Sequence, residues 1–594
     1  MAYSDNFPAQ RASFMADFAN AGRLDSRISF TRASTANVWD GSKHLSSENL
    51  FTYSTPPNGW TLDSFTLTSG QTAPDGSTNA AKLTEDTSGS EHRIYPYSSV
   101  TTSGGSTTLS GYFKYIGRQW VMFRLNDGTN YRRVWFDIQN GALGSAETGI
   151  THSITASGNG YYKCVATIAT SNTSYLPTIG GAPANTGITY TGSGADAFYV
   201  WGLQYNNNVG SVLSETSGQI HREYAPSLVS KSNNAARFDH TTDGQSMGIL
   251  IEGQSTNLIE RSHEVDNSYW NNANGLNVTV DANVAISPTG DLTADMLRPT
   301  TDATAHYLQK TVMATVASTT YTMSAYVKSV GGLTFRMYFV QSASPYTTIA
   351  SGVFTLSGDG SVASVAGSAS IEKVNDDGWY RISVTGAALT TTSTLILQPH
   401  DSGGNLSFAG DGYSGILCTG LQFEANSFPS SLISTSGASA TRAAESLSVA
   451  TADIGYTGGP VSIVAEGEGG RGDYPRLFSM GDSSSYLTFF RLSSAASAST
   501  AYKFWVNDSG VRQADLNEEA SVTRVAVSVD TDSVKSCGNG GAVQSDTAAV
   551  MPVLSTTLQI GDQPTGGKQW NGHCKRVAIY NEALSDSNLQ AITS

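Results

Sequence analysis

The amino-acid sequence predicts an all-β protein with three tandem antiparallel β-sandwich (jelly-roll) domains after a short N-terminal arm. Charged residues make up only 14% of the 594 residues, and glycine reaches 60. Short runs of β-branched and aromatic residues are separated by turns such as Asn126-Asp127-Gly128 and Asn140-Gly141. This pattern is typical of antiparallel sheets and unfavourable for long helices.

The charge balance and hydropathy of the chain argue against two kinds of partner, nucleic acids and membranes. The chain has 34 Lys plus Arg against 49 Asp plus Glu, a formal net charge of −15. Nucleic-acid binding depends on basic patches that displace counterions from phosphates, so we expect no nucleic-acid partner. No apolar stretch approaches the roughly 18 residues of a membrane-spanning helix, and the N-terminus lacks the apolar segment of a signal peptide. We therefore expect no membrane insertion.

The cysteines give no evidence of a metal site. Cys164, Cys418, Cys537 and Cys574 lie far apart and show no Cys/His spacing typical of zinc. Cys537 and Cys574 share one predicted domain and could pair, but a reducing cytosol favours free thiols. We predict no metal and no cofactor.

Residues 1–48 are predicted to form an arm that attaches the chain to a partner or covers the bottom of the next domain. The stretch around Phe14 and Phe18 predicts a short helix ending near Gly22. These two phenylalanines have no place in a strand pattern, so we expect the arm at the interface of a homo-oligomer.

Residues 49–225 (module A) and 257–445 (module B) are predicted to be two copies of one sandwich. Asn49-Leu50-Phe51 corresponds to Asn257-Leu258-Ile259, and Gly202-Leu203-Gln204 to Gly420-Leu421-Gln422, so the offset drifts from 208 to 218 residues. Loop insertions produce such a drift, because strands cannot change register without exposing their apolar face. Aromatic residues in matching places are predicted to fill the two cores: Trp60, Tyr112, Trp270, Trp379 and Tyr380.

The connector, residues 226–256, carries Arg237-Phe238-Asp239-His240 and Gly248-Ile249-Leu250-Ile251-Glu252-Gly253. Phe30-Thr31-Arg32-Ala33-Ser34-Thr35 stands upstream, and Ala440-Thr441-Arg442-Ala443-Ala444 follows module B. Together these segments resemble bacteriophage virion proteins of the tail-fibre or head-fibre kind, with carbohydrate-binding-module-like sandwiches. In that comparison, module A is an insertion or a duplication between the segment at 30–35 and the connector.

The last predicted domain covers residues 446–594. Leu558-Gln559-Ile560-Gly561, the turn Trp570-Asn571-Gly572, the strand ending at Tyr580 and the segment Ala583–Asp586 resemble the end of a laminin-G-like, concanavalin-A-like lectin domain. The strand pattern agrees, since Val577 and Ile579 are expected to point inward and Arg576 and Ala578 outward. The resemblance implies a fold but not one function. Domains with this fold bind sugars, bind proteins or have a purely structural role.

We predict no enzyme and no catalytic residues. Glucanases with this fold need paired carboxylates, commonly spaced Glu-x-Asp-x-x-Glu, and the glutamate clusters here do not have that form. A His-Glu-x-x-His motif is also missing from the sequence.

The resemblance implies a non-enzymatic virion protein, assembled in the bacterial host cytoplasm, that binds host-surface polysaccharide or lipopolysaccharide. Other virion proteins would be held by the N-terminal arm, and a homotrimer would add avidity to weak sugar sites. A purely structural decoration or tail accessory protein is the alternative, and a polysaccharide-degrading enzyme is a more distant one.

Sugars are held by aromatic rings together with Arg, Gln and His side chains. Residues of these types that alternate with core residues are expected to face outward, and these are the candidate carbohydrate-binding residues: Arg124, Trp135, Arg336, Tyr338, Gln398 and His400.

Overall fold

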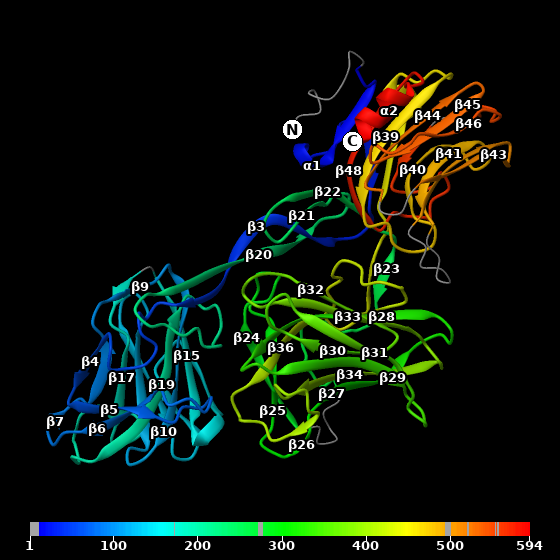
Figure 1. Ribbon diagram of the computed structural model, residues 1–594. Coiled ribbons are helices and arrows are strands. Elements are labelled where there is room, and N and C mark those ends of the chain that lie inside the picture. Colours follow the sequence, from blue (N-terminus) through cyan, green and yellow to red (C-terminus); the bar gives the residue numbers. More distant parts are fainter. Residues whose placement is uncertain are drawn as a thin grey trace.

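The computed structural model describes residues 11–171, 173–270, 277–492, 501–518, 522–552, 554 and 557–594. It confirms the all-β class: within the described residues the strands pair antiparallel in three sandwiches (Figure 1). None of the described helices has the length and apolar character needed to cross a lipid bilayer. All four cysteines are free and buried.

Module A has two six-stranded sheets. In order, the first contains β14 (Ile150–Ala156), β15 (Tyr162–Thr170), β10 (Gly105–Tyr115), β19 (Asp196–Asn206), β6 (Ala80–Glu85) and β5 (Phe65–Gln71). The second contains β13 (Ala142–Ala146), β12 (Tyr131–Asp137), β11 (Trp120–Asn126), β17 (Thr178–Ala182), β8 (Arg93–Pro96) and β4 (Trp60–Asp63). Short pairs join β9 (Val100–Thr101) to β16 (Ser174–Tyr175) and β7 (Gly89–Ser90) to β18 (Tyr190–Thr191), and η2 (Gly158–Gly160) is a 3-10 turn.

Module B has the same strand order. Its first sheet contains β32 (Ser368–Lys373), β33 (Tyr380–Ala387), β28 (Thr320–Val330), β36 (Gly415–Glu424), β25 (Ala294–Pro299) and β24 (Val278–Ala285). Its second contains β31 (Ser361–Ala366), β30 (Thr348–Thr355), β29 (Thr334–Gln341), β34 (Thr392–His400) and β27 (Leu308–Ala314), and β26 (Thr304–Ala305) pairs with β35 (Ser407–Phe408). Each of these strands has its counterpart in module A at the same place in the strand order. Module A also has the edge strand β4, for which the described residues of module B show no match.

One buried asparagine makes the same hydrogen bonds in both modules. The amide of Asn49 donates to the carbonyls of Leu203 and Ser214, and its oxygen accepts from the N–H groups of Phe51 and Tyr205. Asn257 repeats all four bonds with their counterparts: Leu421, Ile433, Ile259 and Phe423. Both side chains are fully buried, so each one ties the start of its module to the strand β19 or β36.

The third sandwich is built from separate parts of the chain. One sheet contains β21 (Phe238–His240), β22 (Ser246–Ile251), β48 (Gly572–Tyr580), β39 (Val461–Glu468), β44 (Arg524–Asp530), β45 (Ser533–Gly538) and β46 (Gln544–Asp546), with β1 (Phe14–Asp17) also paired to β48. The other contains β2 (Ile28–Thr31), β38 (Ser446–Ala450), β47 (Thr557–Ile560), β40 (Arg476–Gly481), β41 (Tyr486–Arg491), β42 (Tyr502–Asp508) and β43 (Val511–Glu518). Helix α2 (Asp586–Thr593) closes the chain, and η3 (Thr451–Ile454) follows β38.

The N-terminal segment therefore differs from the arm that we predicted. A short helix, α1 (Phe18–Ala21), does end at Gly22, which adopts the left-handed conformation. Phe14 and Phe18, however, are 1% exposed and belong to the core of the third sandwich together with Ile249 and Ile251 of the connector. Their apolar side chains are satisfied within the chain, which removes the reason for placing them at an interface between copies.

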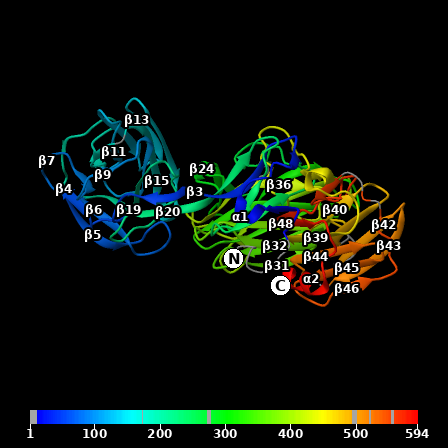
Figure 2. The ribbon, with the colours of Figure 1, turned by 90° about the horizontal axis from the view of Figure 1, so that it is seen from above.

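A long two-stranded ribbon connects the third sandwich to module A. Strands β3 (Ala36–Asn49) and β20 (His221–Lys231) pair over most of their length and run diagonally from the third sandwich to module A in Figure 1. Figure 2 shows module A standing to one side of the other two sandwiches. Module B leaves the third sandwich through the shorter pair β23 (Ser255–Asn257) and β37 (Ala440–Arg442). Both modules are thus insertions in one discontinuous sandwich.

The predicted core aromatics are all buried, but they lie in two kinds of place. Trp60, Trp270 and Tyr380 pack within the main cores of their modules. Tyr112 and Trp379 instead belong to separate clusters outside those cores, where Tyr112 meets Tyr413 of module B. For these two positions the prediction of a sandwich core was wrong, because the outer face of the sheet is covered by a neighbouring part of the chain.

Candidate functional site

The outer face of the five-stranded sheet of module B brings four of the predicted residues together. In β29, Phe335 and Met337 enter the core, so Arg336 and Tyr338 project from the opposite face. Arg336 lies directly opposite Gln398 of β34, and His400 lies opposite Thr334, two pairs further along. Residues opposite each other in antiparallel strands share a face. These four side chains (the module B face) therefore form one patch.

Arg336 and Tyr338 form a stacked pair. The guanidinium carbon of Arg336 lies 4.1 Å from the centre of the Tyr338 ring, and its Nε donates to Ser351 Oγ at 3.0 Å. Both side chains remain partly exposed. Burial raises the pKa of Tyr338, an effect that the phenol of Tyr307 adds to and Arg336 opposes. The pair thus offers a cation, a ring and a protonated hydroxyl to a ligand.

Gln398 and His400 are more buried than we predicted, at 3% and 5% exposed. Both residues lie on β34, an inner strand of the sheet between β27 and β29. Within the described residues, Gln398 Oε1 and both ring nitrogens of His400 make no hydrogen bond of good geometry. The backbone of Gly404 lies close enough to His400 to favour the protonated ring. Burial lowers the pKa of His400, and the charge of Arg336 lowers it further. A neutral imidazole can both donate and accept a hydrogen bond.

Arg124 occupies the matching place in module A, on the outer face of β11. Its Nη2 donates to Thr178 Oγ1 at 3.0 Å, and its Nη1 lies 3.5 Å from Glu91 Oε2. Its guanidinium also lies 5.3 Å from the ring centre of Tyr131, which is 51% exposed. Module A therefore repeats the arrangement of an arginine beside a tyrosine, with a carboxylate added.

Trp135 does not offer a free ring. It faces away from the core of module A, as predicted, but it is only 3% exposed. The loop after β17 covers it: the indole N–H donates to the carbonyl of Gly187 at 2.8 Å, and Met122, Ala182 and Ile188 pack around the ring. The strand pattern locates the face of the sheet, but it contains no information about a loop that folds back over that face.

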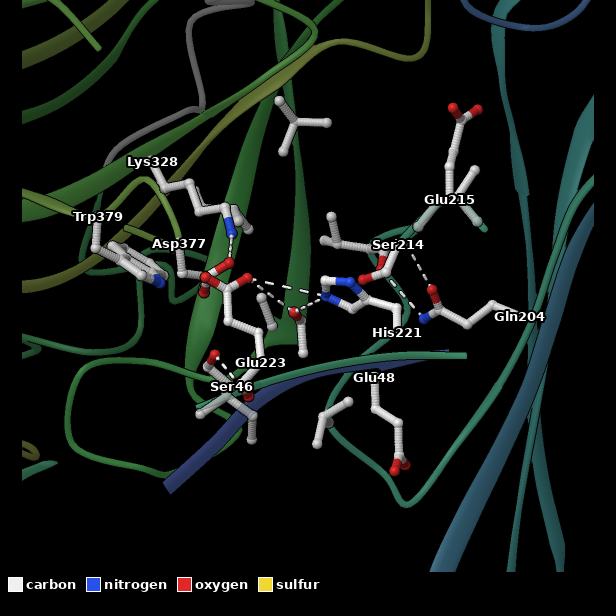
Figure 3. A pocket seen from close by; sticks show the side chains of 18 of the residues that line it. Ser46, Glu48, Gln204, Ser214, Glu215, His221, Glu223, Lys328, Asp377 and Trp379 are labelled. Carbon is white, nitrogen blue, oxygen red and sulfur yellow. Dashed lines mark hydrogen bonds and ion pairs between the residues drawn. The ribbon is translucent and has the colours of Figure 1, made fainter. Parts of the chain in front are cut away.

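A pocket lies where modules A and B meet, and the sequence patterns did not indicate it. Its volume is about 350 Å³, and both modules and the β3–β20 ribbon line it. Figure 3 shows Glu223 of β20 and Asp377 of module B pointing toward each other, with Lys328 behind Asp377. Lys328 Nζ lies 2.6 Å from Asp377 Oδ1, and Ser47 Oγ lies 2.7 Å from His221 Nε2.

Glu223 and Asp377 share this pocket at close range. Burial and Asp377, which lies within hydrogen-bonding reach, together raise the pKa of Glu223 to about 7, while Lys328 opposes the shift. Glycosidases need their two carboxyl groups about 5 Å or more apart. Two carboxyl groups within hydrogen-bonding reach fit neither the retaining nor the inverting glycosidase geometry. We therefore interpret this pair as part of the contact between the modules. Residues this distant in sequence come together only through the docking of two domains, which explains why no sequence pattern indicated the pair.

Among the described residues, no three His, Cys, Asp or Glu side chains are grouped so that they could hold a metal ion.

The third sandwich matches a known family model. Residues 469–590 match the model described as the concanavalin A-like lectin/glucanases superfamily. No curated protein sequence matches the chain significantly.

Several solved structures are similar in part. The CBM40 domain of the Ruminococcus gnavus IT-sialidase, bound to α2,6-sialyllactose, is 16% identical over 23% of this chain and 82% of its own, with a TM-score of 0.19. The CBM22-1–CBM22-2 tandem of Paenibacillus barcinonensis Xyn10C is 11% identical over 64% and 98%, with a TM-score of 0.17. Domains LG4-5 of the mouse laminin α1 chain are 9% identical over 48% and 92%, with a TM-score of 0.16. Values of this size support no transfer of function.

Proposed function

We propose that this chain is a non-enzymatic, fibre-type component of a bacteriophage virion that binds host-surface polysaccharide or lipopolysaccharide through the module B face. One observation carries the glycan-binding part: a partly exposed Arg336–Tyr338 stack lies beside Gln398 Oε1 and the His400 ring nitrogens, which make no hydrogen bond of good geometry within the described residues. Buried polar groups are nearly always hydrogen-bonded. Sugar hydroxyls would supply the missing hydrogen-bond partners. The Arg336 guanidinium and the Tyr338 ring would contact the rest of the sugar.

The virion part of the proposal is supported by the resemblance of Phe30–Thr35, the connector and the exit segment to phage proteins. A homotrimer would raise weak single-site affinity through avidity. Sedimentation of the full chain at micromolar concentration tests this assembly: a mass of one chain would contradict it. Because Phe14 and Phe18 lie in a core, the contact between copies must use another surface.

Binding of the full-length chain to a glycan array tests the ligand-binding role. Retention of defined glycans, weakened by Tyr338→Ala, supports the proposal. The absence of binding to any glycan would instead favour a purely structural component.

A purely structural role has its own support in the contact between the modules. The ring of Tyr413 of module B lies 5.9 Å from that of Tyr112 and 5.6 Å from that of Trp201, both of module A. Arg298 of module B donates to the carbonyl of Ala156 in module A at 2.6 Å. Such contacts suit a rigid spacer. Release of reducing sugar from host polysaccharide would contradict both roles and indicate a degrading enzyme.

A further inference from the structure

The two matching arginines differ in their charge environment. In module A, Arg124 lies 3.5 Å from Glu91, which also pairs with Arg93 at 2.6 Å. Arg93 further pairs with Asp63 at 3.0 Å, and Arg133, opposite Arg124 on β12, pairs with Glu147 at 3.2 Å. The arginines on this face therefore have carboxylates of the same chain as partners.

Arg336 in module B has no such partner in the described residues. It lies opposite Gln398 on one side and Val353 on the other, and its Nε donates to the neutral hydroxyl of Ser351. Asp401, which follows His400, directs its carboxylate to the backbone N–H and the side-chain amide of Asn405. The Arg336 charge is thus uncompensated on its face, although the whole chain carries a net charge of −15.

An unpaired arginine on a partly buried face favours a ligand that brings the missing negative charge. The planar guanidinium matches a carboxylate in shape, and charge-assisted hydrogen bonds are about twice as strong as neutral ones. The Nε of Arg336 is held by Ser351, which orients the group and leaves the terminal N–H groups for a ligand. The nearby Gln398 Oε1 and His400 nitrogens would then receive the hydroxyls of the same sugar.

We infer that the ligand of the module B face is an acidic glycan, in which a sugar carboxylate pairs with Arg336. This inference rests on the proposed glycan-binding function and names its ligand class. The matching face of module A, with Glu91 beside Arg124, would disfavour the same ligand, because its carboxylates repel an anion.

The test is an array printed with uronic-acid and sialic-acid oligosaccharides, each next to its carboxyl-reduced, neutral counterpart. We expect the full-length chain to bind carboxylated members at least tenfold more tightly than the reduced ones, with affinity falling as salt rises. Equal or tighter binding of the neutral counterparts would overturn the inference and leave glycan binding intact. The lack of binding to either set would overturn both.

Matched variants test which module is responsible for the preference for carboxylated glycans. Arg336→Gln is expected to abolish the preference for carboxylated members, and Arg336→Lys to retain part of it, because the charge remains but the planar fork is lost. Arg124→Gln, at the corresponding place in module A, is expected to leave the preference unchanged. If Arg124→Gln abolished the preference and Arg336→Gln did not, the acidic site would lie in module A and the inference would fail. The comparison of acidic and neutral glycans on the unmodified chain stands even if a variant does not fold.

Discussion

Arg237 and Glu445 form a bidentate, fully buried ion pair across 208 residues of sequence: Arg237 Nε and Nη2 each donate to a Glu445 carboxylate oxygen at 2.6 Å. Arg32 binds the same carboxylate at 2.9 Å, and Glu252 lies 2.8 Å from Arg237 and 3.1 Å from Arg442. These five residues (the junction cluster) stand where the chain leaves or re-enters the third sandwich. Four of the five, all except Glu445, lie in the segments whose resemblance was described above, so these segments have a physical role: they tie the insertion points of both modules together.

Loss of one carboxylate from the junction cluster is expected to destabilise the protein strongly. Glu445→Ala would leave Arg32 buried without a carboxylate partner, and Arg237 would share Glu252 with Arg442. Such a loss of one partner from a buried ion pair typically costs about 3–5 kcal/mol. Chemical denaturation followed by tryptophan fluorescence measures the free energy of unfolding. The control is Asp376→Asn, which breaks the Lys373–Asp376 pair. The Asp376 side chain is 94% exposed, so this substitution should leave the free energy of unfolding nearly unchanged. Equal effects of the two substitutions would show that the cluster contributes no special stability.

The buried asparagines make a second prediction. Asn257→Ala removes four hydrogen bonds and leaves buried backbone groups at the start of module B without partners. We therefore expect the free energy of unfolding to fall by about 2–4 kcal/mol. Asn49→Ala should have an effect of similar size confined to module A. Hydrogen exchange, resolved by peptide, measures each module separately. Asn405→Ala, in an exposed loop of module B, serves as the control. Loss of protection in both modules from either substitution would contradict two independent networks.

The repeated strand pattern could be predicted from sequence because each strand carries its own alternation of apolar and polar residues. The same reasoning located the outer faces that hold Arg124, Arg336 and Tyr338. It failed for Phe14 and Phe18, whose partner strand β48 lies more than 500 residues away, and for Trp135, which a loop covers. Contacts between docked domains, such as that of Glu223 with Asp377, produce no periodic pattern in the sequence.

The contact between modules A and B is expected to depend on pH. The pKa of Glu223 is about 7 in the folded protein against an ordinary value of 4.5, because burial and Asp377 disfavour the charged form. Between these two values the unfolded chain loses the proton and the folded chain keeps it. The stability contributed by protonated Glu223 is therefore complete below about pH 4.5 and is lost as pH rises through about 7.

Glu223→Gln, which is neutral at every pH, should reduce this dependence. The free energy of unfolding, measured from pH 5 to pH 8 for both proteins, checks it. The same slope in the variant and the unmodified chain would show that Glu223 does not titrate in this range.

The most direct test of the proposed function is the affinity of the Tyr338→Ala variant, measured by calorimetry with the glycan that the unmodified chain binds most tightly. Removal of the ring that supports Arg336 should cost about 1 kcal/mol, or roughly a fivefold loss of affinity, with a nearly unchanged melting temperature. Tyr131→Ala, at the exposed tyrosine beside Arg124 in module A, should change neither quantity. Unchanged affinity of Tyr338→Ala at unchanged stability would contradict a binding site on the module B face.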